Sequence, residues 1–258
     1  MARLFIFGLG YTAGRIAQAM RGSGWHIDAS GSAGNIAFGD MDAVLPALGS
    51  ASHVLSSVPP ADGTDPVLDR YGHALEGKWL GYLSSTGVYG DAKGAWVDEG
   101  SQTGGGRRTA RALCDARWLE LGSRVFRLPG IYGPGRSAFE RVREGKAHRI
   151  DLPGQVFSRV HVEDIVSSVV AAIEKCAPAG AYNLADDLPT SQNRVIEEAC
   201  RLLGTEPPPL VSIEEADLSP MARGFYAENR RVANGKAKRL LGWKPRYPTY
   251  REGLGSLL

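Results

Sequence analysis

The sequence predicts an α/β protein built on a doubly wound parallel sheet, with a small C-terminal α+β lobe. Short apolar runs typical of buried strands alternate with helical patterns through the first half of the chain. Crossovers between parallel strands are right-handed, so this alternation places helices over both faces of one sheet. No linker divides the 258 residues, which suffice for one large domain or a domain with a small lobe.

The first half begins with a predicted strand over Arg3–Phe7, which ends at a glycine turn. A helix follows, with an apolar stripe that ends at Gly22 and Gly24. The remaining strands of this half are predicted at His26–Ala29, Ile36–Phe38, His53–Val58, Trp79–Ser84 and Arg124–Leu128, with a helix over Arg107–Leu121 before the last. The less regular C-terminal part is predicted to hold a helix at Val162–Lys175, a strand at Ala181–Leu184, a helix at Arg194–Leu203 and a helix at Gly235–Leu241 that Asn234 caps.

Composition is ordinary for a soluble globular protein, which we expect to be cytoplasmic and to have a small-molecule substrate. A net charge of +2 gives no indication of nucleic-acid binding, and no apolar stretch reaches the length needed to cross a membrane. The three cysteines lie far apart, without a CxxC pair or a Cys/His cluster. We therefore expect reduced thiols, and neither a metal site nor a disulfide framework.

The glycine turn is the most informative local motif. Gly8-Leu-Gly10-Tyr-Thr-Ala13 matches G-x-G-x-x-A, and it stands after a predicted strand and before a predicted helix. Gly8 permits the tight turn, and Gly10 allows the backbone to approach a pyrophosphate. The first helical residues, Tyr11 and Thr12, then offer unpaired N–H groups to the phosphates. The sequence therefore predicts a Rossmann-type dinucleotide site.

The residues do not decide between NAD and NADP. Asp28 lies 20 residues after Gly8, which is about the spacing of a ribose-binding acid, but Gly31 occupies the predicted strand end. No arginine stands at Gly31 or Ser32 to hold a 2′-phosphate. Asp40 is a candidate acceptor for an adenine amino group.

Five motifs together resemble the NAD-dependent epimerase/dehydratase family, the extended short-chain dehydrogenase/reductases. They are GLGYTAG (8–14), LSSTGVYGD (83–91), FRLPGIYGPGR (126–136), RVHVEDIV (159–166) and KRLLGWKP (238–245), in family order. The glycine turn and the 126–136 stretch look most like the atypical branch of that family. The resemblance implies an NAD(P)-binding domain at 1–155 and a region at 156–258 that holds most of the substrate lobe and elements completing the sheet, interleaved with the first.

The resemblance also implies roles for matched residues. Ser85 falls where the family has a catalytic serine or threonine, with Thr86 as a neighbouring substitute. The residues that would contact the cofactor are Ser57, Val58, Pro129, Gly130 and Ile131, and those that would face the substrate are Tyr132, Arg136, Arg159 and His161. Members of the family often pair through helices, which leaves a homodimer built on the 107–121 helix open.

The family's catalytic Tyr-x-x-x-Lys is replaced in this chain. The family often carries an acid four residues after the lysine, and Asp115 fits that place. Arg111 then takes the lysine position and Arg107 the tyrosine position. A guanidinium stays protonated and accepts no hydrogen bond, so Arg107 cannot act as a proton carrier. Arg111 could still hold ribose hydroxyls or a phosphate. Tyr89 and Lys93 have the right spacing, but the glycines around them indicate a loop rather than a helix.

Two functions follow as hypotheses. The first is an NAD(P)-dependent epimerase/dehydratase or reductase acting on a sugar-like or nucleotide-linked substrate, in which water, Tyr132, His161 or a substrate group replaces the missing phenol. The second is a catalytically inactive NAD(P)-binding sensor or regulatory protein, which the replaced tyrosine suggests. A basic cluster between Arg141 and Arg149 either meets a phosphate-bearing substrate or is a solvated helix end, and its charge pattern favours the latter.

Overall fold

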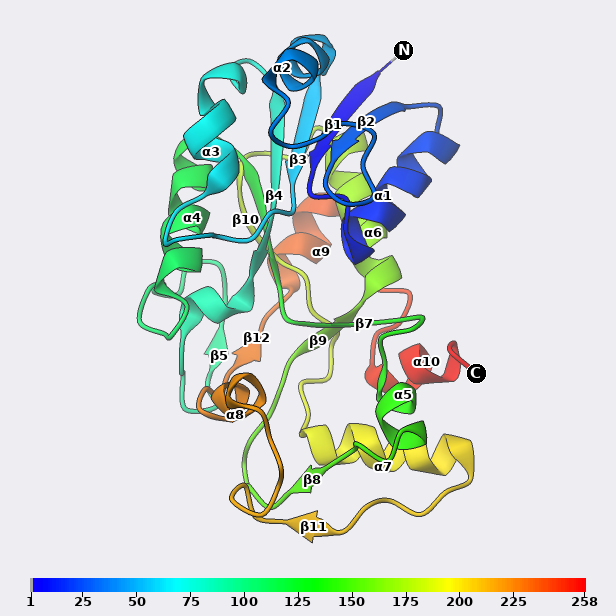
Figure 1. The fold of residues 1–258 in the computed structure, drawn as a ribbon. Coiled ribbons are helices and arrows are strands. Elements are labelled where there is room, and N and C mark those ends of the chain that lie inside the picture. The colour runs from blue at the N-terminus through cyan, green and yellow to red at the C-terminus, as the bar shows by residue number, and fades with distance from the viewer. Residues whose placement is uncertain (1) are drawn as a thin grey trace.

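A six-stranded parallel sheet forms the centre of the molecule (Figure 1). The computed structural model describes residues 2–258, apart from the side chain of Met221. The strands lie in the order β10-β6-β4-β3-β1-β2, and every neighbouring pair is parallel. Their bounds are β1 Arg3–Phe7, β2 His26–Ser30, β3 His53–Ser56, β4 Trp79–Ser85, β6 Arg124–Leu128 and β10 Gly180–Asn183. The predicted doubly wound α/β fold is confirmed.

Helices cover both faces of this sheet (Figure 1). On one face lie α1 (Tyr11–Gly22), α6 (Val162–Glu174) and α9 (Gly235–Leu241), and on the other lie α2 (Met41–Ser50), α3 (Pro66–Tyr71) and α4 (Thr109–Glu120). Alternate strand residues face the two layers: Leu4 and Ile6 pack beneath α1, whereas Phe5 and Phe7 pack on the opposite side. Both faces are therefore apolar, as a buried parallel sheet requires.

The remaining elements form a lobe beyond the carboxyl ends of the strands (Figure 1). Phe139, Ile196 and Leu254 share a separate apolar core from three of its helices. Its helices are α5 (Ala138–Arg143), α7 (Gln192–Leu203), α8 (Pro220–Tyr226) and α10 (Tyr250–Gly255), and the short strand pairs here are β5 (Trp96–Val97) with β12 (Arg231–Val232), β7 (Gly130–Tyr132) with β9 (Arg159–His161), and β8 (Arg149–Ile150) with β11 (Leu210–Val211). Two 3₁₀ turns, η1 (Gly72–Ala74) and η2 (Thr86–Tyr89), complete the described elements. The boundary at residue 155 stays a prediction, although β10 shows that the C-terminal part contributes to the sheet.

Two local predictions were wrong. Ile36–Phe38 is not a strand, because only one bridge joins Ile36 to Ser30 before Asp40 caps helix α2. Asn234 precedes α9 but does not cap it, since its side chain donates to Ala185 O and Asp187 Oδ1 instead. Among residues 2–258, no helix has both the length and the apolar character that crossing a bilayer requires.

Candidate functional site

A cleft of about 960 Å³ lies between the sheet and the lobe. Its walls come from the glycine turn, the ends of β4 and β6, the start of α4 and the lobe helices. Ligand sites in open α/β sheets form at this edge, where the carboxyl ends of parallel strands meet. Of the predicted cofactor residues, those that line the cleft are Gly10, Tyr11, Thr12, Ser57, Arg111, Pro129, Gly130 and Ile131.

The glycine turn leaves the start of α1 open to this cleft. Gly8 adopts a φ of +83°, and its N–H and that of Leu9 donate to Ser30 O. The N–H groups of Tyr11, Thr12 and Ala13 have no acceptor among the described residues, and Gly10 offers no side-chain cap. A Cβ built on Gly10 would meet no atom within 4 Å. The turn therefore fits the pyrophosphate of a dinucleotide, which these donors and the helix dipole would hold.

Other predicted cofactor residues have structural partners. Ser57 Oγ donates to Gly8 O, so it fixes the turn, and Val58 packs against the same glycine without lining the cleft. Asp40 accepts from Ala43 N and caps α2, also outside the cleft. Asp28 is engaged by His26 and by Asn35, at 3.1 and 3.0 Å. Both carboxylates thus have partners within the protein, and neither lines the cleft.

Ser85 and Thr86 stand where β4 ends, and both line the cleft. Ser85 Oγ accepts from Gly87 N at 3.1 Å and from Arg108 Nη1 at a longer 3.4 Å. Sequence reasoning missed Arg108, because it expected the helix to begin at Arg107. Helix α4 begins at Thr109, so Arg107 and Arg108 both precede its first residue. The adjacent arginines in the sequence were the one available signal.

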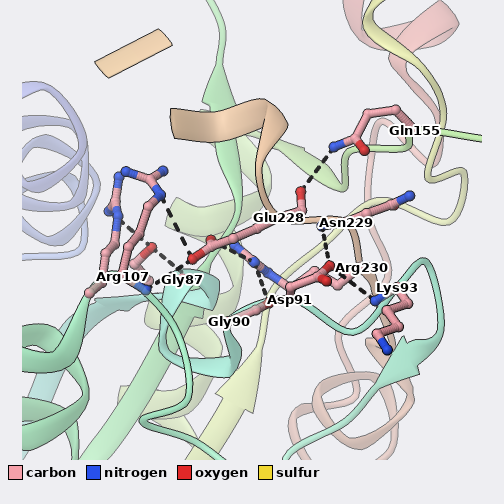
Figure 2. A network of polar contacts seen from close by, with 11 residues as sticks. Gly87, Gly90, Asp91, Lys93, Arg107, Gln155, Glu228, Asn229 and Arg230 are labelled. Carbon is pink, nitrogen blue, oxygen red and sulfur yellow. Dashed lines mark hydrogen bonds and ion pairs between the residues drawn. The ribbon is translucent and has the colours of Figure 1, made fainter. Parts of the chain in front are cut away.

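Arg107 and Arg111 hold other partners. Arg111 Nη1 donates to the hydroxyl of Tyr82 at 2.8 Å. Figure 2 shows Arg107 beside Glu228, whose Oε1 accepts from Arg107 N at 3.2 Å and lies 3.7 Å from Arg107 Nε. The other carboxylate oxygen of Glu228 is 2.9 Å from Arg230. Glu228 therefore neutralises part of the cationic wall while it fixes the loop before α4.

Tyr89 and Lys93 do not form a catalytic pair in this structure. Tyr89 is buried at the end of η2, where its hydroxyl donates to Asn183 and accepts from Arg127. Lys93 lies in the following turn with a φ of +51°, held through its backbone by Asp91 (Figure 2). The loop conformation expected there is what the structure shows.

The predicted substrate residues differ in their access to the cleft. Tyr132, Arg136 and Arg159 line it, and Arg136 stacks over the ring of Tyr11. The Tyr132 hydroxyl points at the backbone of Gly253, where an added Cβ would lie 1.9 Å from it. Burial, and then the charge of Asp186, raises the pKa of Tyr132 well above its ordinary value. The hydroxyl is therefore a poor proton carrier.

The structure does not place His161, predicted to face the substrate, in the cleft. The ring is 1% exposed, does not line the cleft, and lies between the rings of Tyr132 and Tyr247. Its Nδ1 accepts from Glu163 N and caps α6. Burial, with smaller contributions from two arginines, lowers the pKa of His161 to about 4. His161 is the last residue of strand β9 and directly precedes helix α6, and this position explains its structural role as a cap.

Positive charge dominates the cleft. Three glutamates, Glu140, Glu144 and Glu228, stand among its lining residues, against seven arginines: Arg107, Arg108, Arg111, Arg136, Arg141, Arg159 and Arg230. Arg141 and His148, from the basic cluster that the charge pattern assigned to solvent, are among the lining residues. An excess of guanidinium groups in a concave site favours carboxylate or phosphate ligands.

The comparisons with known proteins concern the family and the fold. No family model matches the chain. A solved structure of a functionally unknown conserved protein from Silicibacter pomeroyi is 39% identical, with a TM-score of 0.89, over 100% of this chain and 98% of that one. A 3-diazoavenalumate denitrifying reductase from Streptomyces is 33% identical over 162 residues, which are 57% of this chain and 52% of the relative. The chain spans little more than half the length of the curated relatives it matches.

More distant structures identify the fold. A Methylobacillus flagellatus protein, provisionally assigned as an NAD-dependent epimerase/dehydratase, has a TM-score of 0.78 at 19% identity, over 99% of this chain and 97% of that one. Two neighbours were solved with cofactors. A Bacillus anthracis dTDP-glucose 4,6-dehydratase with NAD has a TM-score of 0.76 at 17% identity, over 98% of this chain and 94% of that one. A human epimerase family protein with NADPH has a TM-score of 0.75 at 13% identity, over 99% of this chain and 98% of that one. The chain belongs to one family with the Silicibacter protein, and its fold is that of the NAD-dependent epimerase/dehydratases and extended short-chain dehydrogenase/reductases.

Proposed function

We propose that the protein is an NAD(P)-dependent reductase or epimerase/dehydratase that acts on a polar, anionic substrate. The single observation that carries the proposal is the open start of helix α1, which faces the same cleft as Ser85. A dinucleotide held there by the free N–H groups of Tyr11 and Thr12 would supply or accept a hydride. Pro129, Gly130 and Ile131 would border it from the end of β6.

The excess of arginines in the cleft supports an anionic substrate. Phe157, Phe225 and Tyr226 add aromatic surface to the same walls. The name of the Streptomyces relative, 3-diazoavenalumate denitrifying reductase, denotes an organic anion and a reduction. An aromatic or sugar-like carboxylate or phosphate therefore fits the lining better than a neutral apolar carbonyl compound.

Calorimetric titration of the purified protein with NADH, and separately with NADPH, tests the proposal. We expect micromolar binding of at least one, because the turn presents donors with no protein acceptor. Absence of binding to both would contradict the proposal. A panel of anionic aldehydes, ketones and alcohols, followed by nicotinamide absorbance, then separates two functions.

The alternative is a protein that binds the cofactor without turnover, as the replaced tyrosine suggests. Binding without absorbance change across the panel would favour this sensor function. A Ser85→Ala variant adds a second criterion, because an enzyme should lose turnover while a sensor should keep its cofactor affinity.

A further inference from the structure

The hydroxyl of Ser85 has one hydrogen-bonding capacity left over. A serine hydroxyl accepts through two lone pairs and donates through one O–H. Gly87 N at 3.1 Å and Arg108 Nη1 at 3.4 Å occupy the accepting side. No acceptor for the Ser85 O–H is found among the described residues, and the residue lines the cleft. Ser85 is therefore set to donate to an oxygen that a ligand brings.

At the same point, Arg108 adds a positive charge without a direct ion-pair partner among the described residues. The side chain is half-buried, and in the described part of the chain no carboxylate lies within 4.0 Å of its guanidinium. Its guanidinium lies over the ring of Phe225, 5.4 Å from the centroid. Burial, followed by the charges of Arg107 and Arg111, lowers the pKa of Arg108, yet a guanidinium remains protonated in proteins. A negative charge placed beside it would relieve this repulsion.

Tyr132, His161 and Tyr89, the side chains weighed as replacements for the family's tyrosine, are held away from this point. Tyr132 directs its hydroxyl at the backbone of Gly253, and His161 is buried outside the cleft. Tyr89 is committed to Asn183 and Arg127. Two donors therefore converge where the reacting oxygen would stand, and neither Ser85 nor Arg108 gives up a proton readily near neutral pH.

We propose that Arg108 and Ser85 form an oxyanion site that binds the reacting oxygen of the substrate and replaces the family's tyrosine. The assignment rests on the proposed function. In the reductive direction, a bound NAD(P)H would supply the hydride as a C–H bond of its reduced nicotinamide breaks. A new C–H bond forms at the carbonyl carbon, and the C=O π pair moves onto oxygen. Arg108 and Ser85 stabilise the resulting alkoxide by charge and hydrogen bonds, and water supplies the proton that completes the alcohol.

Binding of benzoate, a simple carboxylate probe, tests the site without cofactor or turnover. Calorimetry should show binding to the wild type that weakens about tenfold or more in Arg108→Gln, because a charge-assisted contact is lost. Arg117→Gln is the matched control, since Arg117 lies on α4, the helix that Arg108 directly precedes, and pairs with Asp69 away from the cleft. Arg108→Lys should be intermediate, because it keeps the charge and loses the planar fork. Circular dichroism would verify that each variant folds.

Three outcomes would overturn the site: no benzoate binding by the wild type, no loss in Arg108→Gln, or an equal loss in Arg107→Gln, which would mean that binding follows net charge alone. With any carbonyl compound from the panel that is reduced, Arg108→Gln should lower kcat by about 100-fold, the typical cost of one oxyanion donor. An unchanged kcat would also overturn it. If neither NADH nor NADPH binds, the proposed function is contradicted, and the anion site is then tested by the benzoate result alone.

Discussion

The buried pair of Arg127 and Asp115 shows how much depends on single residues near the site. Their closest atoms, Nη2 and Oδ1, are 2.6 Å apart, and both side chains are almost fully buried. Asp115 also accepts from Ser84, the residue before the proposed oxyanion serine. The pair thus joins α4, β4 and β6 directly beneath the cleft.

Replacing Asp115 by alanine should lower the free energy of unfolding by about 3–5 kcal/mol, because Arg127 would keep its charge without a partner in a buried environment. Urea denaturation followed by circular dichroism measures the loss. Asp69→Ala is the control, since its partner Arg117 is exposed and no resolvable change is expected. Equal stability of the two variants would show that Asp115 is dispensable for stability.

At the residue scale, the sequence placed local motifs correctly in the fold. Gly8 and Gly10 form the turn before α1 and Ser85 ends β4, because short spacings define a turn and a strand end, while their roles in binding and catalysis stay predictions. Arg108 was missed as a partner of Ser85, and the contact of Glu228 with Arg107 was not foreseen. Glu228 reaches the loop before α4 across 121 positions, and Arg108 reaches Ser85 across 23. Contacts at such separations depend on how elements pack, which one sequence does not reveal.

At the scale of elements, the glycine turn separates folding from ligand binding. Gly8 has a φ of +83°, and a Cβ there would lie 3.0 Å from Ser57 Oγ. Gly10 has a φ of −96°, which any residue adopts, and open space on its Cα. Gly8 is thus required by the backbone conformation, whereas Gly10 leaves space beside its Cα for a ligand.

We therefore expect Gly8→Ala to lose about 1–3 kcal/mol of stability through backbone strain, whereas Gly10→Ala should melt like the wild type. Gly10→Ala should instead weaken NAD(P)H binding about tenfold or more, because its methyl group would stand where the pyrophosphate approaches. Thermal melts and calorimetry on both variants check this contrast. Full cofactor affinity in Gly10→Ala would place the pyrophosphate elsewhere.

The sequence located all six strands of the central sheet, because buried parallel strands are short apolar runs bounded by glycine, proline or polar residues. The false strand at Ile36–Phe38 has the same apolar character, but Ile36 and Phe38 pack from a loop onto the core beneath α2 and α3. Periodicity over three residues does not distinguish a strand from a buried loop.

At the scale of the whole molecule, the cleft lies where the lobe contacts the strand ends. The sequence predicted the lobe but not which residues would meet there. The contact buries two polar groups whose pKa values shift in opposite directions. Burial raises the pKa of Asp186 to about 7 and lowers that of His161 to about 4. Around His161 stand Tyr132 and Tyr247, with the charges of Arg15 and Arg246 disfavouring its protonation.

These shifts make opposite contributions to stability with pH. Asp186 binds its proton more tightly when folded, so its contribution is lost as pH rises from about 4 to 7. His161 binds its proton more weakly when folded, so its contribution is present above pH 6.5, the ordinary value, and is lost as pH falls toward 4. Between these limits the pH dependences of the two contributions to stability partly cancel, so replacing one group should reveal the pH dependence that the other causes.

His161→Asn removes the titrating ring and keeps a good cap for α6, because asparagine is among the preferred N-cap residues. Between pH 7.5 and pH 5, protonation of His161 in the unfolded chain should cost the wild type about 2 kcal/mol of unfolding free energy that the variant does not lose. The stability of the variant relative to the wild type should therefore rise by that amount on acidification. Urea titrations of both proteins at the two pH values measure this difference, from which Asp186 cancels because both proteins contain it. Parallel pH profiles would mean that the buried ring becomes protonated in the folded state as easily as in the unfolded chain.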